Sequence, residues 1–261
     1  MRGWALLALL CAAAAGCVRS QFNLATQREE LTITSTEKEI EVGRKLARQV
    51  EHELSLVADE PLQDRVNAIG QRLAAVCDRQ ELAYHFAVVE DKEVNAFSLP
   101  GGYVFVNDGL IKKTANDDEL AGVVAHEVAH VAARHAVKRY ESGLGLQLVQ
   151  LATLAARQGA VTQGVSVAAQ AAQLAYARQD ELEADRLAVK YLKAAGFNPK
   201  GMLTFLETLR SLTSEQTIYL PRGVIRPHYG LTHPFVPERI RTVKEALFGV
   251  ADYLDYVNTP E

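Results

Sequence analysis

The strongest constraint on the fold is a helical stretch, Glu119–Tyr140, that carries an H-E-x-x-H motif from His126 to His130. Residues four apart share one face of an α-helix, with Cβ atoms about 5–6 Å apart, so both imidazoles can bind one small metal ion. Zn²⁺ is the usual occupant of such a pair. Glu127 directly follows the first histidine, so its carboxylate can reach a water molecule rather than the metal. The pattern predicts a zinc helix with Glu127 as the catalytic residue.

The start of this helix is also encoded locally. Asn116 can cap it, and Asn116 with Glu119 has the spacing of a capping box. The alternative is that the motif is a chance pattern of surface or core histidines. Apolar flanks argue against chance, because unpaired polar groups on a buried helix are costly. These flanking residues are Val123, Val124, Val128 and Val131.

A catalytic zinc needs a third protein ligand and an open position. Ala133 and Ala136 stand where the metzincin pattern continues with a glycine and a third histidine. His135 would lie half a turn away from the ligand face of a continuous helix. A glutamate on a later helix, Tyr176–Ala195, is therefore the natural candidate.

The remaining patterns predict a compact, mainly helical α+β fold with a small antiparallel sheet beside the metal helix. We expect a single domain over residues 35–261, because nothing marks a linker within it. The net charge of -4, without a long basic patch, argues against a nucleic-acid partner. The expected elements are helices over 36–56, from 61, 199–213 and 237–248, a strand over 82–90, and a hairpin over 94–106 around Pro100-Gly101-Gly102.

The N-terminus reads as a bacterial secretory signal over residues 1–17, with Arg2 before the apolar run Trp4–Ala15. Its end, Ala-Gly-Cys, resembles the lipobox of bacterial lipoproteins, in which Cys17 would be lipidated. Ordinary cleavage is the alternative. Val18 stands where inner-membrane lipoproteins often carry Asp, which favours the outer membrane, on its periplasmic side. Residues 18–34 are expected to be a tether of little fixed structure.

One segment after the metal helix is nearly free of charge. Between Glu141 and Arg178 the only charged residue is Arg157, and apolar residues recur at helical spacing. We expect a pair of helices over 144–177, each too short and too polar to span a bilayer. The pair is either buried and Ala-rich, or it presents a face to the membrane or to a partner.

The motif and a second block, Arg178-x-x-Glu181-x-Glu183-Ala184-Asp185, together resemble the gluzincin family of membrane-associated metallopeptidases. This family includes the CAAX prenyl endopeptidase, HtpX, the Oma-type proteases, and the periplasmic enzymes BepA and LoiP. The plan of the chain resembles that of a short LoiP-like periplasmic lipoprotein. Its other matching blocks are Asn95-Ala96-Phe97, Pro100-Gly101-Gly102, His233-Pro234 and Arg239-Ile240.

The resemblance implies roles for the second block. Glu181 would be the third metal ligand, with Glu183 as the competing choice. Asp185, one turn later, would orient a ligand histidine. Arg178 would pair with Asp185 or with substrate, or would form a plain surface ion pair.

The resemblance also implies that His233 is a reversible plug of the zinc site. The alternative is a loop histidine that caps the final helix. The hairpin could align an extended peptide along its edge, or it could be purely structural. The candidate substrate contacts are Asn95, Phe97, Gly101, Gly102, Tyr103 and Arg239.

The function implied is a zinc endopeptidase with one Zn²⁺ per chain that degrades misfolded or stalled envelope proteins. Its partners would be protein or peptide substrates, the membrane through a lipid anchor at Cys17, and envelope assembly machinery. One alternative is an envelope chaperone or assembly factor whose proteolysis is latent and gated. A zinc hydrolase that does not cleave peptides is another.

Overall fold

The computed structural model describes residues 18–142, 176–216 and 232–249. The signal segment 1–17, with Cys17, lies outside the described residues, and so does nearly all of the helical pair expected over 144–177. Within the described ranges, no helix combines the length and the apolar character needed to cross a membrane.

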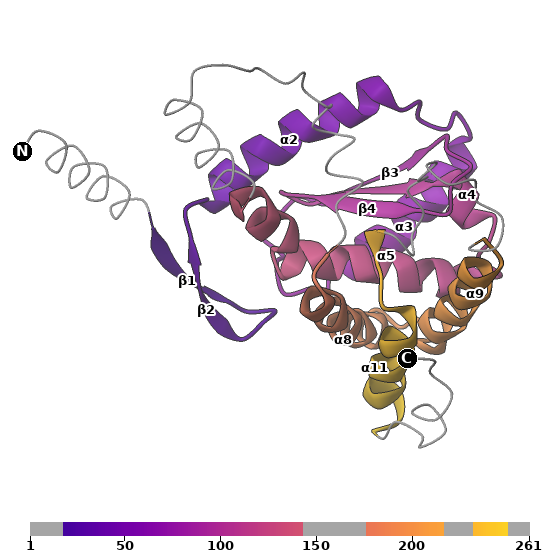
Figure 1. Ribbon diagram of the computed structural model, residues 1–261. Coiled ribbons are helices and arrows are strands. Elements are labelled where there is room, and N and C mark those ends of the chain that lie inside the picture. Colours follow the sequence, from indigo (N-terminus) through magenta and orange to yellow (C-terminus); the bar gives the residue numbers. More distant parts are fainter. Residues whose placement is uncertain (1–17, 143–175, 217–231, 250–261) are drawn as a thin grey trace, which may run out of the picture.

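The structure is mainly helical and contains two small sheets, which confirms the predicted fold class. The helix α2 covers one face of a three-stranded sheet, and α5 covers the other face (Figure 1). The helices α8, α9 and α11 pack on the far side of α5, and α3 packs against α5 and β3. The elements are β1 (Arg19–Asn23), β2 (Arg28–Thr32), α2 (Thr36–Glu53), α3 (Glu60–Ala74), β3 (His85–Val89), β4 (Ala96–Leu99), β5 (Tyr103–Asn107), α4 (Asp108–Ile111), α5 (Asp117–Ala132), α8 (Arg178–Ala194), α9 (Lys200–Gln216) and α11 (Val236–Phe248).

The larger sheet contains the predicted hairpin. β4 and β5 pair antiparallel, with Ala96 opposite Val106. The third strand, β3, pairs parallel with β5, so the sheet is mixed rather than purely antiparallel. Gly102 in the hairpin turn has a φ of +95°, and a Cβ there would lie 2.6 Å from the carbonyl oxygen of Ala83. The turn therefore requires glycine for both its backbone conformation and its close contact.

The cap of α5 forms as the sequence predicts, except that Glu119 reaches the backbone nitrogen one residue before the capping Asn116. The side chain of Asn116 accepts a hydrogen bond from the backbone nitrogen of Glu119 at 3.0 Å. The Glu119 carboxylate in turn accepts from the nitrogen of Ala115 at 2.8 Å. Two backbone donors at the helix start are therefore satisfied by local side chains.

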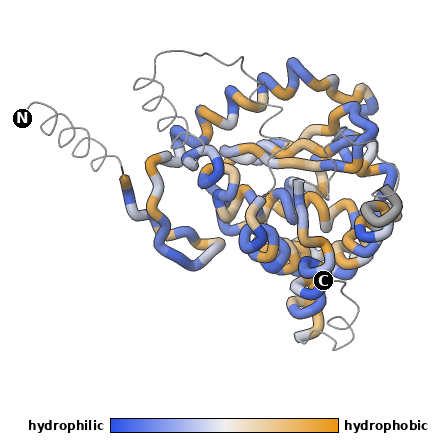
Figure 2. Tube along the Cα trace, in the orientation of Figure 1, coloured by the Kyte–Doolittle hydropathy of each residue, from blue (hydrophilic) through white to orange (hydrophobic). Residues whose placement is uncertain are grey.

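The helix α5 lies at the centre of the core. All its residues from Glu119 onward are buried, and hydrophobic residues run along it and the sheet (Figure 2). A Cβ on Gly122 would lie 2.7 Å from the Cα of Met202, so glycine lets α9 approach α5 closely. A histidine or glutamate on α5 is therefore removed from solvent by packing on several sides.

The predicted continuous helix over 119–140 is wrong, because α5 ends at Ala132. Arg134 takes a left-handed conformation with a φ of 59°, and a new helix covers 135–142. A non-glycine residue in this conformation needs support from its surroundings. The buried Glu39 provides it, because its carboxylate lies 3.3 Å from Nε of Arg134 and 2.8 Å from Arg79. This ion cluster connects α2 to the turn after α5.

The expectation of a tether over residues 18–34 with little fixed structure is also wrong. β1 and β2 form an antiparallel hairpin in which Arg19 pairs with Thr32. The hairpin is held by the segment after α5, through Arg134 to Gln21 at 2.5 Å and Lys138 to Glu30 at 2.8 Å. These partners lie more than one hundred positions away in the sequence, so a local pattern could not reveal them.

Candidate metal centre

Four buried side chains from three parts of the chain meet on one side of α5. His126 and His130 come from α5, Glu181 from the first turn of α8, and His233 from the segment before α11. One ligand atom from each lies within 4.8 Å of all the others. The three residues predicted as ligands are therefore brought together, and the competing candidate Glu183 is not part of the group.

The spacing of these atoms fits a tetrahedral zinc ion. Zn–N and Zn–O bonds of about 2.0–2.1 Å place neighbouring ligand atoms about 3.3 Å apart. The Nε2 atoms of His126 and His130 are 2.9 Å apart, and each lies 3.4 Å from an oxygen of Glu181. Nδ1 of His233 lies 3.3 Å from His126 Nε2 and 3.1 Å from Glu181. The donor set of three imidazoles and a carboxylate is also one that zinc prefers.

Glu127 lies beside the cluster without joining it. Both of its carboxylate oxygens are buried and accept no hydrogen bond from the described residues. The ring atom Nε2 of His233 is 3.3 Å from one of them. A buried carboxylate without a donor is costly unless a further group, such as a water molecule, satisfies it. This is the placement that a general base requires.

The centre is closed to solvent. His126, Glu127, His130, Glu181 and His233 each have an exposed fraction of 0%. A substrate cannot reach Glu127 unless part of the surrounding structure moves.

Asp185 and Arg239 surround the ligands from α8 and α11. Oδ1 of Asp185 lies 2.9 Å from Nδ1 of His126, which is the contact predicted for Asp185. The buried guanidinium of Arg239 donates to Asp185 from Nη2 at 2.8 Å and from Nε at 2.9 Å. Its Nη1 lies 3.1 Å from Glu181. Arg239 therefore holds two of the carboxylates rather than facing a substrate groove.

The predicted pairing of Arg178 with Asp185 is wrong. Arg178 is exposed and pairs with Glu238 of α11, as in the alternative of a surface ion pair. The two residues lie on the same helix, but Arg178 is its first residue and extends into solvent.

Sequence reasoning missed a contact made by His135. It is not a member of the metal cluster, but its Nδ1 lies 2.8 Å from Nδ1 of His130, on the side of that ring away from the cluster. Its Nε2 lies 3.3 Å from Glu183, and Glu183 lies 3.8 Å from Arg28 of the hairpin. The left-handed Arg134 redirects the chain after α5 and so makes this contact, which a continuous helix would exclude.

Tyr176 is a second residue that sequence reasoning missed. Its ring stacks on His130 with centroids 3.8 Å apart, and its backbone nitrogen donates to the Thr232 carbonyl at 3.2 Å. Thr232 also donates to the side chain of Asn95 at 3.0 Å. Asn95, predicted to contact substrate, thus holds the segment that carries His233.

The other predicted substrate contacts lie away from the cluster. Phe97 packs on Phe105 in a small core beneath α2, with ring centroids 5.3 Å apart. Tyr103 stacks on His85 at 4.7 Å. Gly101 donates its backbone N–H to Glu39 at 3.2 Å, within the turn described above. The alternation along β4 explains this, because Phe97 and Leu99 face α2 whereas Ala96 and Ser98 face α5.

The backbone of β4 retains an open edge within the described sheet, whose order is β3-β5-β4. Asn95 and Asn107 form a hydrogen-bonded pair, so the alternation of antiparallel ladders turns the polar groups of Ala96 and Ser98 outward. The carbonyl of Ala96 lies 3.3 Å from Nε2 of His233. His233 therefore contacts the cluster and the edge strand at once.

Burial and neighbouring charges shift the pKa values of two of the ligands, His130 and Glu181, in the direction that zinc binding requires. Burial, together with the neighbouring imidazoles, lowers the pKa of His130 well below its usual range, which favours the neutral ring that binds zinc. Burial alone would raise the pKa of Glu181, but His233 and Arg239 lower it well below its usual range. Both residues are thus held in the form required of a zinc ligand.

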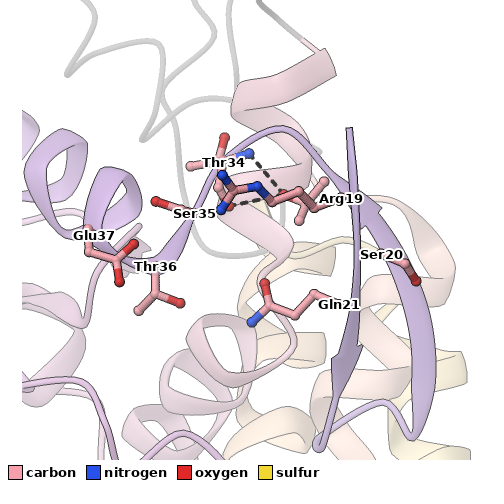
Figure 3. A pocket seen from close by; sticks show the side chains of 8 residues that line it. Arg19, Ser20, Gln21, Thr34, Ser35, Thr36 and Glu37 are labelled. Carbon is pink, nitrogen blue, oxygen red and sulfur yellow. Dashed lines mark hydrogen bonds between the residues drawn. The ribbon is translucent and has the colours of Figure 1, made fainter. Parts of the chain in front are cut away.

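A separate hollow of about 270 Å³ lies between β1 and the start of α2 (Figure 3). It is lined by polar side chains, including Arg19, Thr34 and Glu37, and by none of the cluster residues. It takes no part in the metal centre.

An H-E-x-x-H helix joined by a glutamate from a second helix, around four converging ligand atoms, defines the class of zinc metalloendopeptidases. The model of peptidase family M48 matches residues 60–247, which include every member of the cluster. The chain therefore belongs to peptidase family M48, whose members use zinc.

Curated relatives carry names of the same kind. The chain is 31% identical to the "Beta-barrel assembly-enhancing protease" of Escherichia coli over 214 residues, which are 78% of this chain and 42% of the relative. It is 28% identical to the "Mitochondrial metalloendopeptidase OMA1" of Schizosaccharomyces pombe over 182 residues, 70% of this chain and 52% of the relative. The chain thus spans about half the length, or less, of these relatives.

Proposed function

We propose that the protein is a zinc-dependent endopeptidase of the bacterial cell envelope that cleaves misfolded or stalled envelope proteins. The observation that carries the proposal is the convergence of His126, His130 and Glu181 beside a buried, unsatisfied Glu127. Membership of a peptidase family supports protein or peptide substrates.

In this proposal His126, His130 and Glu181 are the permanent ligands of one Zn²⁺. When bound, zinc acts as a Lewis acid that polarises the scissile carbonyl and lowers the pKa of a water molecule. Glu127 removes a proton from the attacking water and later passes it to the leaving amine. Asp185, held by Arg239, fixes the orientation of the His126 ring from its Nδ1 side.

His233 blocks this machinery in the closed state. Its Nδ1 occupies the fourth corner of the cluster, and its Nε2 approaches both Glu127 and the carbonyl of Ala96. An extended substrate paired along β4 would need that carbonyl as a hydrogen-bond partner. Displacement of His233 would therefore open the water position and the peptide-binding edge together.

The proposed location is the periplasmic face of the outer membrane, with a lipid on Cys17. The support is the lipobox-like end of the signal segment, with Val18 in the following position. The E. coli relative is named for assembly of β-barrels, and bacterial barrels of this kind reside in the outer membrane. Envelope assembly machinery is accordingly a proposed partner.

The experiment compares zinc content and casein cleavage in the parent protein and in Glu127→Gln. We expect about one zinc per chain in both proteins and cleavage in the parent only, because Gln keeps the shape but cannot accept the proton. Absence of zinc from the parent would contradict the metal centre. Equal cleavage by the two proteins would contradict the role of Glu127.

A second candidate is an envelope chaperone or assembly factor whose proteolysis is latent. The observation that favours it is the complete burial of Glu127 behind His233. The two functions are separated by complementation of a deletion strain with Glu127→Gln. Full rescue would support the assembly role, and failure to rescue would support proteolysis.

A further inference from the structure

Exposed hydrophobic side chains are concentrated at the beginning of the described chain. Of the eight large hydrophobic residues exposed in the described ranges, five lie between positions 18 and 33. The exposed apolar surface of the described residues is therefore concentrated in this segment. The exposed fractions of these five residues are 46% for Val18, 48% for Phe22, 58% for Leu24, 76% for Leu31 and 51% for Ile33.

Phe22 and Leu31 lie on one side of the β1–β2 hairpin, because Leu31 is opposite Ser20, two positions before Phe22 on β1. Val18, Leu24 and Ile33 flank the strands at positions that continue this alternation, and we call the side of these five residues the outer face. From Ser20 to Ala25 and from Glu29 to Thr34, exposed positions alternate with half-buried or buried ones. Phe22 and Leu24 alternate with the buried Asn23 and Ala25, and Leu31 alternates with the buried Thr32. The hairpin therefore directs several polar side chains toward the protein and its large apolar side chains away from it, the reverse of an ordinary surface hairpin.

The opposite side of the hairpin, its inner face, is held against the rest of the protein by polar contacts. The apolar outer face is therefore exposed in a fixed orientation. The carboxylate of Glu141 accepts from the hydroxyl of Thr32 at 2.6 Å and from the nitrogen of Thr34 at 2.9 Å. Arg28 also reaches Glu183 of α8. Rotation of the hairpin to bury its apolar side would break these contacts.

The position of this face in the chain indicates its occupant. Val18, its first residue, directly follows Cys17, and one residue spans at most about 3.6 Å. A lipid on Cys17 would therefore hold the outer face at the membrane surface without any intervening linker. We propose that the outer face of the hairpin lies in the interfacial layer of the bilayer that anchors the protein. This inference rests on the proposed anchor at Cys17.

The charged residues around the outer face are compatible with shallow insertion of that face into the bilayer interface. Glu29 lies on the outer face opposite Phe22, and the hydroxyl of Ser20 donates to it. The flanking strand positions include Arg19 and Arg28. Charged groups can remain among lipid headgroups while neighbouring apolar side chains enter the acyl boundary. Because the hairpin is fixed to the segment after α5 and to α8, such insertion would set the orientation of the zinc helices relative to the membrane.

Depth-dependent fluorescence quenching tests the proposal on the full chain. The chain has one tryptophan, Trp4, so the background is Trp4→Phe, with Leu31→Trp as the reporter. Leu56→Trp is the matched control, because Leu56 is 44% exposed and follows the end of α2 that lies far from the hairpin in Figure 1. Each protein, purified from the membranes of a bacterial host, is placed in vesicles of phosphatidylethanolamine and phosphatidylglycerol that contain brominated lipids.

We expect bromines near the headgroup end of the acyl chain to remove most of the fluorescence of Leu31→Trp and to leave Leu56→Trp unchanged. Equal quenching at both sites would indicate general adsorption and would overturn the proposal, as would no quenching at either site. The mass of the mature N-terminus reports separately on Cys17. A lipidated chain without quenching overturns this inference but keeps the anchor, whereas an unlipidated chain overturns both. Neither readout depends on zinc or on cleavage.

Discussion

The two sides of the metal centre are held in different ways. On one side, His126, His130 and Glu181 belong to α5 and α8, two helices packed in the core. On the other side, His233 lies outside a helix, and the contacts of its segment include those to Asn95, Tyr176 and Arg239. We therefore expect that the three helical ligands are permanent parts of the fold and that His233, the exchangeable ligand, can leave without unfolding it.

The largest expected effect is a loss of zinc affinity on mutation of a permanent ligand, Glu181. Glu181→Ala should weaken zinc binding strongly, because it removes the only carboxylate of the cluster and leaves His126 and His130 as the only permanent ligands. Glu183→Ala is the matched control two positions away. It should weaken zinc binding less than about tenfold, because Glu183 contacts the ligand His130 only indirectly, through His135. Competition with a chromogenic chelator measures both affinities, and equal losses would contradict the choice of Glu181.

The next effect tests whether His135 positions a ligand. His135→Phe should weaken zinc binding by about 10–100-fold, since the Nδ1 of His130 loses its partner. His135→Asn should restore most of the affinity, because its side-chain oxygen can take the place of the accepting ring nitrogen. A purely structural role for His135 would predict similar zinc dissociation constants for the two variants.

For His233, the exchangeable ligand, we predict a gain of proteolytic activity on mutation. His233→Ala should raise casein cleavage by roughly tenfold, if the open state is populated at about 10% in the parent. Zinc should remain bound through the three permanent ligands. His85→Ala is the control, because His85 is an exposed histidine on the sheet. Loss of zinc from His233→Ala would show that His233 is a structural ligand and would remove the distinction between the two sides.

The smallest expected effect loosens the segment without removing its histidine. Asn95→Ala deletes the hydrogen bond from Thr232, worth about 1 kcal/mol, so the closed state should lose about fivefold in population relative to the open state. Cleavage should rise by less than in His233→Ala. A fall in cleavage, with an unchanged melting temperature, would instead support the predicted contact of Asn95 with substrate.

Several features of the fold and site were predictable because they are local. The cap of α5, the hairpin around Gly101 and Gly102, and the shared face of His126 and His130 each depend on residues a few positions apart. The contact of Asp185 with His126 was also expected, but only through the resemblance to a family. The predictions of a tether over residues 18–34 and of an unbroken helix over 119–140 were wrong. The structure of both segments is set by contacts with residues that are distant in the sequence. The left-handed Arg134 is stabilised by Glu39 and by Gln21 of the β1–β2 hairpin, and the same contact to Gln21 holds that hairpin.

The sequence alone determined that His126 and His130 share one face of a helix beside Glu127, because backbone hydrogen bonds set the period of a helix within a few residues. Only the tertiary structure decided which groups surround them. His233 approaches His126 from 107 positions away, and Arg239 reaches Asp185 from 54 positions away. Such long-range contacts are determined by how whole helices pack and by where turns redirect the chain. For that reason the closed state of the centre, the contact of His135 and the outward apolar face of the hairpin became visible only in the folded chain.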